Sequence, residues 1–255
     1  MAKSQDWATR ITHEASLHDS NCFLTLTYND EHYPERGSVS IRELQLFHKR
    51  ARKKLGRMRF FACGEYGDQN WRAHYHVILF GQDFSSDRTL HRISPGGHPL
   101  YRSPTLEILW PYGFAEIGTV THQSAAYVSR YVLKKVTGRN ADSHYSRPHP
   151  VTGEFTQLRP EFIIMSNKPG IGADWYDKYS ADCFPSDFLI LDGRRVPVPK
   201  AYMVRHKRQE ERNAELLIAK RKAQARKHAE NNTEERLAVR EELQEIRAKQ
   251  LKREI

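Results

Sequence analysis

Two histidines separated by one residue are the first candidates for chemistry in this sequence. His74 and His76 belong to an otherwise apolar run, HisTyrHisValIleLeuPhe, at residues 74–80. If this run is a β-strand, the alternation of side chains places both imidazoles on one face of a sheet. Two imidazoles on one face are a ready pair of ligands for a divalent metal ion. Two surface histidines on a half-exposed strand would give the same pattern, because so short a motif also arises by chance.

A nearby carboxylate can complete this candidate metal site. Glu65 lies in the preceding β-like run, residues 59–66, near the mouth of a predicted hairpin. Two imidazoles and one carboxylate leave coordination positions open for substrate oxygens. An ion pair between Glu65 and Arg72 is the alternative for this residue. A zinc hydrolase that activates water is an alternative for the whole group, although it gives the tyrosines of the next motif no role.

A second group of reactive side chains lies in TyrValSerArgTyrValLeuLysLys at residues 127–135. On a helix, Tyr127 and Tyr131 are one turn apart on one face, and Lys134 and Lys135 follow within four residues of Tyr131. A phenol has a pKa of about 10, so it becomes a useful nucleophile only beside a metal-polarised phosphate or a cation. An ordinary pair of aromatic side chains that packs on a sheet would show the same spacing.

The charge of the chain indicates an anionic partner. Its 255 residues include 41 Lys and Arg against 31 Asp and Glu, a formal charge of +10. The densest basic cluster comprises Lys49, Arg50, Arg52, Lys53, Lys54, Arg57 and Arg59. We interpret this cluster as a nucleic-acid surface. A protein that only binds single-stranded nucleic acid, with cations on phosphates and aromatic rings on bases, is therefore the alternative function.

Other classes of protein are disfavoured by what the sequence lacks. Cys22, Cys63 and Cys183 are far apart, which argues against a disulfide framework and against a cysteine zinc site. No run is long and apolar enough to span a bilayer, and residues 1–20 lack the apolar core of a secretory signal. We therefore expect no membrane partner and a location in the cytoplasm of the cell that makes the protein.

Periodicity and turn residues predict the elements that position these groups. The expected strands occupy residues 22–28, 59–66, 74–80, 113–120 and 161–166. The second and third of them are joined by a loop of hairpin length, which predicts antiparallel neighbours. Residues 189–198 are predicted to form a further hairpin that turns at AspGly. Residues 82–105 have no period and are predicted to be a loop.

Three helices are predicted in the same part of the chain. A helix over about 41–55 follows a capping box of Ser40 and Glu43 and presents its cations to solvent. A second helix begins at Thr121 and runs to about Val136. A short third helix covers residues 173–179. The mixture predicts an α+β domain with a central antiparallel sheet and flanking helices.

The end of the chain has a different composition. Residues 200–255 combine strong helix formers with an excess of Lys and Arg, and their apolar residues never sustain a heptad. We expect a folded domain over residues 1–199 and a basic, partly helical tail over residues 200–255. A segment that merely aids solubility would have the same composition.

Three motifs in this order resemble the HUH endonuclease superfamily, in which two histidines flank a usually hydrophobic residue and a tyrosine helix follows. They are CysGlyGluTyrGly at 63–67, HisTyrHisValIleLeuPheGly at 74–81 and the tyrosine motif at 127–135. Tyr75 takes the middle position here. The paired tyrosines and trailing LysLys are similar to those of the rolling-circle replication initiators of microviruses. LysProGlyIleGlyAlaAspTrpTyr at 168–176 resembles their gokushovirus branch.

The resemblance implies a fold, a reaction and partners. The fold would be HUH endonuclease-like, related to RRM and ferredoxin-like sheets. Its metal ligands would be His74, His76 and Glu65, holding Mg²⁺ or Mn²⁺, and its catalytic residues Tyr127, Tyr131, Lys134 and Lys135. A tyrosine would attack a phosphodiester of single-stranded origin DNA, giving a 5′-phosphotyrosine adduct and a free 3′-hydroxyl that primes a host polymerase, with a host helicase as a further partner. No nucleotide cofactor is needed, because the bond energy is kept in the phosphotyrosine.

Overall fold

The computed structural model describes residues 2–130 and 135–250, and its contacts divide the chain into two compact units. The larger unit spans Lys3–Gly172, and the smaller one begins at Ala173. Contacts alone do not define a part that folds independently, so the boundary expected at residue 199 stays a prediction.

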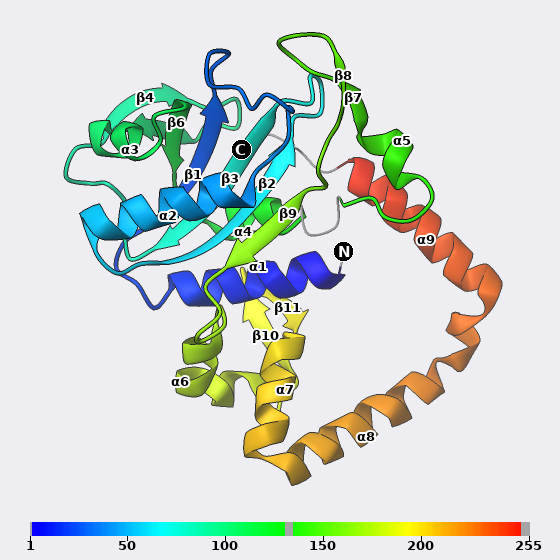
Figure 1. The fold of residues 1–255 in the computed structure, drawn as a ribbon. Helices are drawn as coiled ribbons and strands as arrows, with labels where there is room; N and C mark the ends of the chain where they lie inside the picture. Colours follow the sequence, from blue (N-terminus) through cyan, green and yellow to red (C-terminus); the bar gives the residue numbers. More distant parts are fainter. Residues whose placement is uncertain (1, 131–134, 251–255) are drawn as a thin grey trace. The chain divides into compact units, whose positions relative to one another are not determined.

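A seven-stranded antiparallel sheet is the framework of the larger unit, and helices flank it (Figure 1). Its strands lie in the order β4-β5-β6-β1-β3-β2-β9. Their bounds are β1 Asn21–Tyr28, β2 Arg59–Tyr66, β3 Ala73–Phe80, β4 Thr89–Ile93, β5 Pro99–Arg102, β6 Gly113–Gly118 and β9 Phe162–Met165. The expected α+β class is thus confirmed, and so is the antiparallel pairing of β2 with β3.

The two faces of the sheet have different covers. Tyr75, Val77 and Leu79 of β3 share a hydrophobic cluster with Leu44 and Phe47 of α2 (Ile41–Leu55). Residues of opposite parity on β3 share a second cluster with α1 (Ala2–Ala15) and α4 (His122–Arg130); its members include Ile78, Phe80, Ile11, Ala125 and Val128. Because side chains alternate along a strand, His74 and His76 lie on the α1 and α4 side.

Helix α2 begins and ends as the sequence predicts. The hydroxyl of Ser40 accepts a hydrogen bond from the backbone amide of Glu43, which satisfies one of the free amides of the first turn. Gly56 follows the last residue with a φ of 89°, a conformation that side chains with a Cβ rarely adopt. The helix therefore runs from Ile41 to Leu55, and its buried residues face the sheet.

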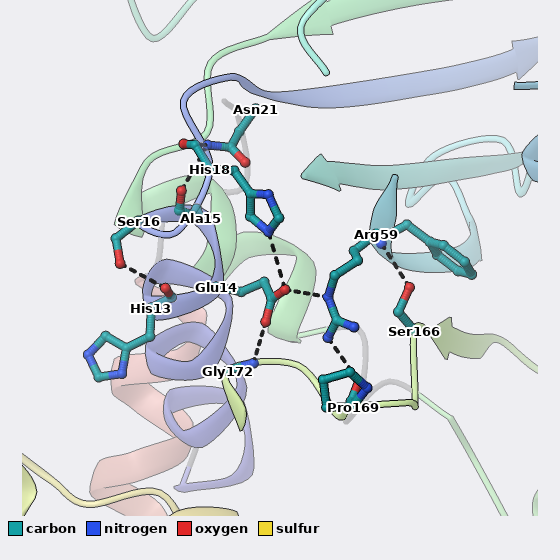
Figure 2. Close-up of polar contacts among 11 residues, drawn as sticks. His13, Glu14, Ala15, Ser16, His18, Asn21, Arg59, Ser166, Pro169 and Gly172 are labelled. Atoms are coloured by element: carbon teal, nitrogen blue, oxygen red, sulfur yellow. Dashed lines mark hydrogen bonds and ion pairs between the residues drawn. The ribbon is translucent and has the colours of Figure 1, made fainter. Parts of the chain in front are cut away.

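Helix α1 was not predicted, and a buried ion pair fixes it to the sheet (Figure 2). Glu14 is 1% exposed and pairs with Arg59 at the start of β2. The second oxygen of Glu14 accepts a hydrogen bond from the amide of Gly172 at 2.7 Å, and Arg59 also donates to the carbonyl of Pro169 at 2.9 Å. The interpretation of Arg59 as part of the basic nucleic-acid surface is therefore wrong, because this ion pair occupies its guanidinium.

Residues 82–105 are not a simple loop, and that expectation is wrong. They contain the β4–β5 hairpin, which extends the sheet beyond β6, and the first residues of α3 (Pro104–Leu109). All five side chains of β4 are exposed, so the strand has no alternation of buried and exposed residues that the sequence could have revealed. Helix α3 starts with Pro104 behind an N-cap of Ser103, the place where a missing amide hydrogen costs nothing.

Three short elements follow α4 in the larger unit. They are α5 Ala141–Tyr145, β7 Ser146–Pro148 and β8 Phe155–Gln157, and the two strands pair with each other. Residues 135–137 are not helical, so the expected continuation of α4 to Val136 is wrong at its end. Tyr131 and Lys134 lie outside the described residues.

The smaller unit contains the remaining elements. They are α6 Ala173–Cys183, β10 Phe188–Leu191, β11 Arg194–Pro197, α7 Lys200–Gln209, α8 Glu211–Lys227, a short 3₁₀ helix Ala229–Asn232 and α9 Glu234–Lys249. The hairpin and the helical character of the tail are as predicted. Tyr202 and His206 of α7 are nevertheless buried, and the hydroxyl of Tyr176 in α6 lies 3.1 Å from Nδ1 of His206. Among the described residues, no helix has the length and hydropathy needed to cross a bilayer.

Candidate metal centre and nucleophile

Three ligand atoms converge on one face of the sheet as a result of strand register. Glu65 of β2 lies directly opposite His74 of β3, and His76 is two residues further along the same face. The Nε2 atoms of His74 and His76 lie 2.7 and 2.9 Å from Oε1 of Glu65. All three candidate ligand atoms are within 4.8 Å of one another. The structure therefore brings together the three residues expected to bind a metal.

Burial and charge favour the ionised form of this carboxylate. Glu65 is 1% exposed and His76 is 5% exposed, so the two are not surface residues. Burial acts to raise the pKa of Glu65, but hydrogen bonds from His74 and His76 and their positive charge outweigh it and lower the pKa to about 2. Arg72, the alternative partner of Glu65, pairs with Asp30 at 2.8 Å. An ionised carboxylate between two imidazoles is a donor set that fits a divalent cation.

Neighbouring groups hold both imidazole rings in place. Nδ1 of His74 lies 3.0 Å from the carbonyl oxygen of Arg72, and since a carbonyl can only accept, this nitrogen carries a proton and donates it. Nδ1 of His76 lies 3.2 Å from the hydroxyl of Thr25, its partner across β1. The ring of Phe23 stacks on His76 with centroids 5.2 Å apart. These contacts leave the Nε2 atoms toward Glu65 and orient them as ligands.

Thr25 and Phe23 were not predicted as part of the site. Their signal was present in the register of the sheet, because β1 pairs with β3 and places Thr25 opposite His76. The sequence predicted β1 as a strand but did not reveal its neighbours. A residue that contacts a ligand across a strand pair is therefore visible only once the strand order is known.

Tyr127 lies beside the candidate metal centre. Its ring meets the ring of His76 with centroids 5.3 Å apart and planes at 81°. Helix α4 sets this position, because its Ala125 and Val128 are buried in the core while Tyr127 is only half-buried. The start of the helix is fixed by reciprocal hydrogen bonds, in which the amides of Thr121 and Ser124 donate to each other's hydroxyl groups at 2.8 and 3.1 Å. The predicted cap at Thr121 is confirmed.

The other predicted catalytic residues are placed less closely or not at all. Lys135 is exposed and lies beyond the described end of α4. Tyr131 and Lys134 are outside the described residues, so a pair of alternating tyrosines stays a prediction. A cation missed by the sequence analysis lies closer, since the guanidinium of Arg130 is 5.6 Å from the centre of the Tyr127 ring.

The predicted nucleic-acid surface and the histidine site lie on opposite faces of the sheet (Figure 1). Helix α2 packs on the face that carries Tyr75, whereas the histidines are on the other face. Five cations of α2 and the loop after it are exposed, namely Lys49, Arg52, Lys53, Lys54 and Arg57. Arg50 is half-buried and donates to the carbonyl of Leu109 at 3.1 Å. The structure therefore does not bring this basic cluster to the candidate metal centre.

Comparison with known proteins gives one family and several relatives. Residues 21–136 match the family of the replication-associated protein ORF2. The chain is 34% identical over 210 residues to the replication-associated protein VP4 of Bdellovibrio phage phiMH2K, covering 78% of this chain and 62% of that one. It is 30% identical over 209 residues to the replication-associated protein ORF4 of Chlamydia phage 1, covering 78% and 49%. It is 28% identical over 223 residues to the replication-associated protein ORF2 of Spiroplasma virus 4, covering 81% and 64%.

These relatives are longer than the chain, which spans from about half to just under two thirds of their length. No solved structure matches the chain significantly. The matched family interval contains Glu65, both histidines and both tyrosines of the motifs. The family match and the three relatives confirm the resemblance drawn from the motifs and place the chain among the replication-associated proteins of microviruses.

Proposed function

We propose that this protein initiates rolling-circle replication by cutting and rejoining single-stranded DNA, with a tyrosine as the nucleophile. The observation that carries the proposal is the position of Tyr127 against His76, which puts a phenol next to a buried set of two imidazoles and a carboxylate. A protein that only binds nucleic acid has no use for such a set, because phosphate contacts and base stacking need no divalent ion. A metal hydrolase that activates water would leave the nearby phenol without a role.

The proposed reaction balances without a nucleotide cofactor. The oxygen of Tyr127 forms a bond to phosphorus, the bond from phosphorus to the 3′ oxygen breaks, and the phenol proton is replaced by a proton taken up at the 3′ oxygen. A phosphodiester is exchanged for a phosphotyrosine, so the reverse reaction can close a strand. The positive charge of Arg130 near the ring favours the phenolate. Tyr131 is the candidate for a second cut, with Lys134 and Lys135 as further candidate cations.

The residues of the site fit Mg²⁺ or Mn²⁺. Glu65, His74 and His76 would hold the ion, and the two nitrogen donors suit Mn²⁺ better than Mg²⁺, which prefers oxygen. When bound, the ion would polarise the scissile phosphate and offset its developing charge. Thr25 and the carbonyl of Arg72 would keep the two imidazoles oriented.

The proposed substrate and partners follow from the relatives. Their names attach replication to phages of bacteria, so the substrate would be the single-stranded origin DNA of such a phage. The free 3′-hydroxyl would be extended by a host polymerase together with a host helicase in the bacterial cytoplasm.

The test is the detection of a covalent adduct. Single-stranded DNA from the origin, labelled at its 3′ end, is incubated with the protein with and without Mn²⁺ and resolved on a denaturing gel. We expect a metal-dependent, protease-sensitive adduct that disappears in the double variant Tyr127→Phe, Tyr131→Phe. Binding without any adduct would support the binding protein, and cleavage without an adduct would support the hydrolase.

A further inference from the structure

A groove runs beside the candidate metal centre, between the sheet face that carries the histidines and the β4–β5 hairpin. Two pockets form it. The first is lined by residues that include His76, Tyr127 and Arg92. The second is lined by residues that include Phe114 and Arg102. Thr25 and Glu116 line both pockets, so the two adjoin and the groove leads away from the histidines across β1 and β6.

The register of three strands explains this arrangement. Thr27 of β1 lies between His74 of β3 and Phe114 of β6, and Thr25 lies in the same way between His76 and Glu116. Neighbouring strands are about 4.8 Å apart, so Phe114 and Glu116 lie roughly 10 Å from the histidines in backbone position. A strand of DNA whose phosphate reached the metal centre would cross these two rows with its adjacent nucleotides.

Phe114 offers a platform for a base in this groove. Its side chain is 57% exposed although it lies within a strand of the central sheet. A large aromatic ring that is this exposed contributes little to the core, whereas its free face suits base stacking of any sequence. The small side chain of Thr27 next to it keeps the path toward His74 open.

Two arginines of the hairpin supply the positive charge that α2 cannot bring to this face. Nε and the terminal nitrogen of Arg92 donate to the two carboxylate oxygens of Glu116 at 2.7 and 2.8 Å. Arg102 donates to Glu107 at 2.7 Å. A phosphate can accept the same paired hydrogen bonds from a guanidinium. Since exposed ion pairs contribute little to stability, the exchange of Glu116 for a phosphate costs little.

We propose that this groove binds the nucleotides that flank the bond cut by Tyr127, with Phe114 stacked on a base and Arg92 released from Glu116 to a phosphate. The identity of the strand rests on the proposed function. DNA contacts close to the site are thereby assigned to β6 and the β4–β5 hairpin, and the cations of α2 are left to more distant DNA.

Base stacking can be measured without cleavage. Origin oligonucleotides with 2-aminopurine at successive positions are bound in EDTA, and fluorescence quenching is read at each position. We expect quenching at one or two positions, its loss there in Phe114→Ala, and binding that is roughly tenfold weaker in that variant. Phe155→Ala is the matched control, because Phe155 of β8 is 77% exposed and outside the groove, and it should leave both values unchanged.

The outcomes separate the groove from the cleavage reaction. An adduct in Mn²⁺ without any quenching that depends on Phe114 would overturn the groove and leave the proposed function standing. Quenching that depends on Phe114 without any adduct would overturn the tyrosine reaction and leave the groove as a nucleotide-binding site.

The exchange of partners by Arg92 gives a second test of opposite sign. Glu116→Gln frees Arg92, so we expect binding that is a few-fold tighter and a steeper dependence on salt. Arg92→Ala should weaken binding, and the double variant should match Arg92→Ala, because Glu116 acts through Arg92. Asp83→Asn is the control, since it breaks the comparable pair with Arg88 outside the two pockets. Binding by Glu116→Gln that is unchanged or weaker, in a protein with a normal circular dichroism spectrum, would overturn the exchange.

Discussion

Tyr127 and His76 meet edge to face, with ring centroids 5.3 Å apart. The two residues belong to α4 and β3, which lie far apart in the sequence and meet because α4 packs on the sheet through Ala125 and Val128. The contact sets the distance between a candidate nucleophile and a candidate metal ligand. Changes at either residue should therefore act on cleavage and not on the fold.

The first prediction concerns the metal ligand in this contact. His76→Ala should slow adduct formation roughly hundredfold or more, because a ligand of the polarising ion is lost. Affinity for single-stranded DNA should stay within a few-fold, since phosphate contacts dominate it. Adduct rates and fluorescence anisotropy in EDTA measure the two effects. His32→Ala, a change at an exposed histidine, is the control, and an equal loss of binding and cleavage by folded His76→Ala would contradict the ligand role.

The site could be predicted from sequence as far as it depends on local periodicity. Alternation along β3 places His74 and His76 on one face, and the short loop before β3 makes β2 its neighbour, which brings Glu65 to them. The capping residues of α2 and α4 likewise mark where these helices begin. Each of these features is set within a few residues of the chain.

The features that escaped prediction depend on the order of strands and on which face a helix covers. The basic residues of α2 are spaced as a nucleic-acid surface, but nothing in that spacing says that α2 packs on the face away from the histidines. The hairpin of β4 and β5 has no buried alternation to reveal it. Helix α1 is polar along most of its length and is fixed by Glu14, whose partner Arg59 lies 45 residues away.

The second prediction is a pH dependence that arises from His48. Its ring stacks on Phe60 with centroids 3.7 Å apart, and neither ring nitrogen has a hydrogen-bond partner in the described part of the protein. Burial, helped by the charge of Arg52, lowers the pKa of His48 from 6.5 to about 3. Between these values the unfolded chain binds the proton more readily, so this stability is complete above pH 6.5 and is lost as the pH falls toward 3.

At pH 5 the loss amounts to about 2 kcal/mol relative to pH 7. His48→Phe keeps a ring against Phe60 but cannot be protonated, so its free energy of unfolding should fall less between pH 7 and pH 5. Urea unfolding at both pH values measures the difference. His91→Gln, at an exposed histidine, should keep the dependence of the original protein, and a parallel fall in His48→Phe would contradict the assignment.

The third prediction concerns the ion pair of Glu14 and Arg59. Removing one partner leaves the other charge buried, so Glu14→Gln and Arg59→Met should each lower the free energy of unfolding by about 3 kcal/mol. The double variant should lose less than the sum of the two. The salt dependence of DNA binding should not change in Arg59→Met, because the guanidinium is already occupied. A shallower salt dependence in this variant would return Arg59 to the nucleic-acid surface.

The fourth prediction separates the two faces of the sheet. Replacing Lys49, Lys53 and Lys54 of α2 by Ala should weaken the binding of long single-stranded DNA and make its salt dependence shallower, because fewer counterions are released. Binding and cleavage of a short oligonucleotide that covers only the cut site should be unaffected, since α2 lies on the other face. Anisotropy titrations with both lengths test this difference. An equal effect on the short oligonucleotide would mean that the strand at the site also reaches α2.

The fifth prediction is a positioning role for Thr25, whose hydroxyl lies 3.2 Å from Nδ1 of His76. Thr25→Val keeps the shape but loses this contact, so Mn²⁺ affinity should fall roughly tenfold and the cleavage rate should recover at saturating Mn²⁺. Thr25→Ser should restore both. Thr27→Val is the matched control, because Thr27 lies on the same face but donates to the carbonyl of Phe114. Electron paramagnetic resonance of free Mn²⁺ measures the affinity directly. A cleavage defect in Thr25→Val that saturating Mn²⁺ does not relieve would show that Thr25 acts on the DNA and not through His76.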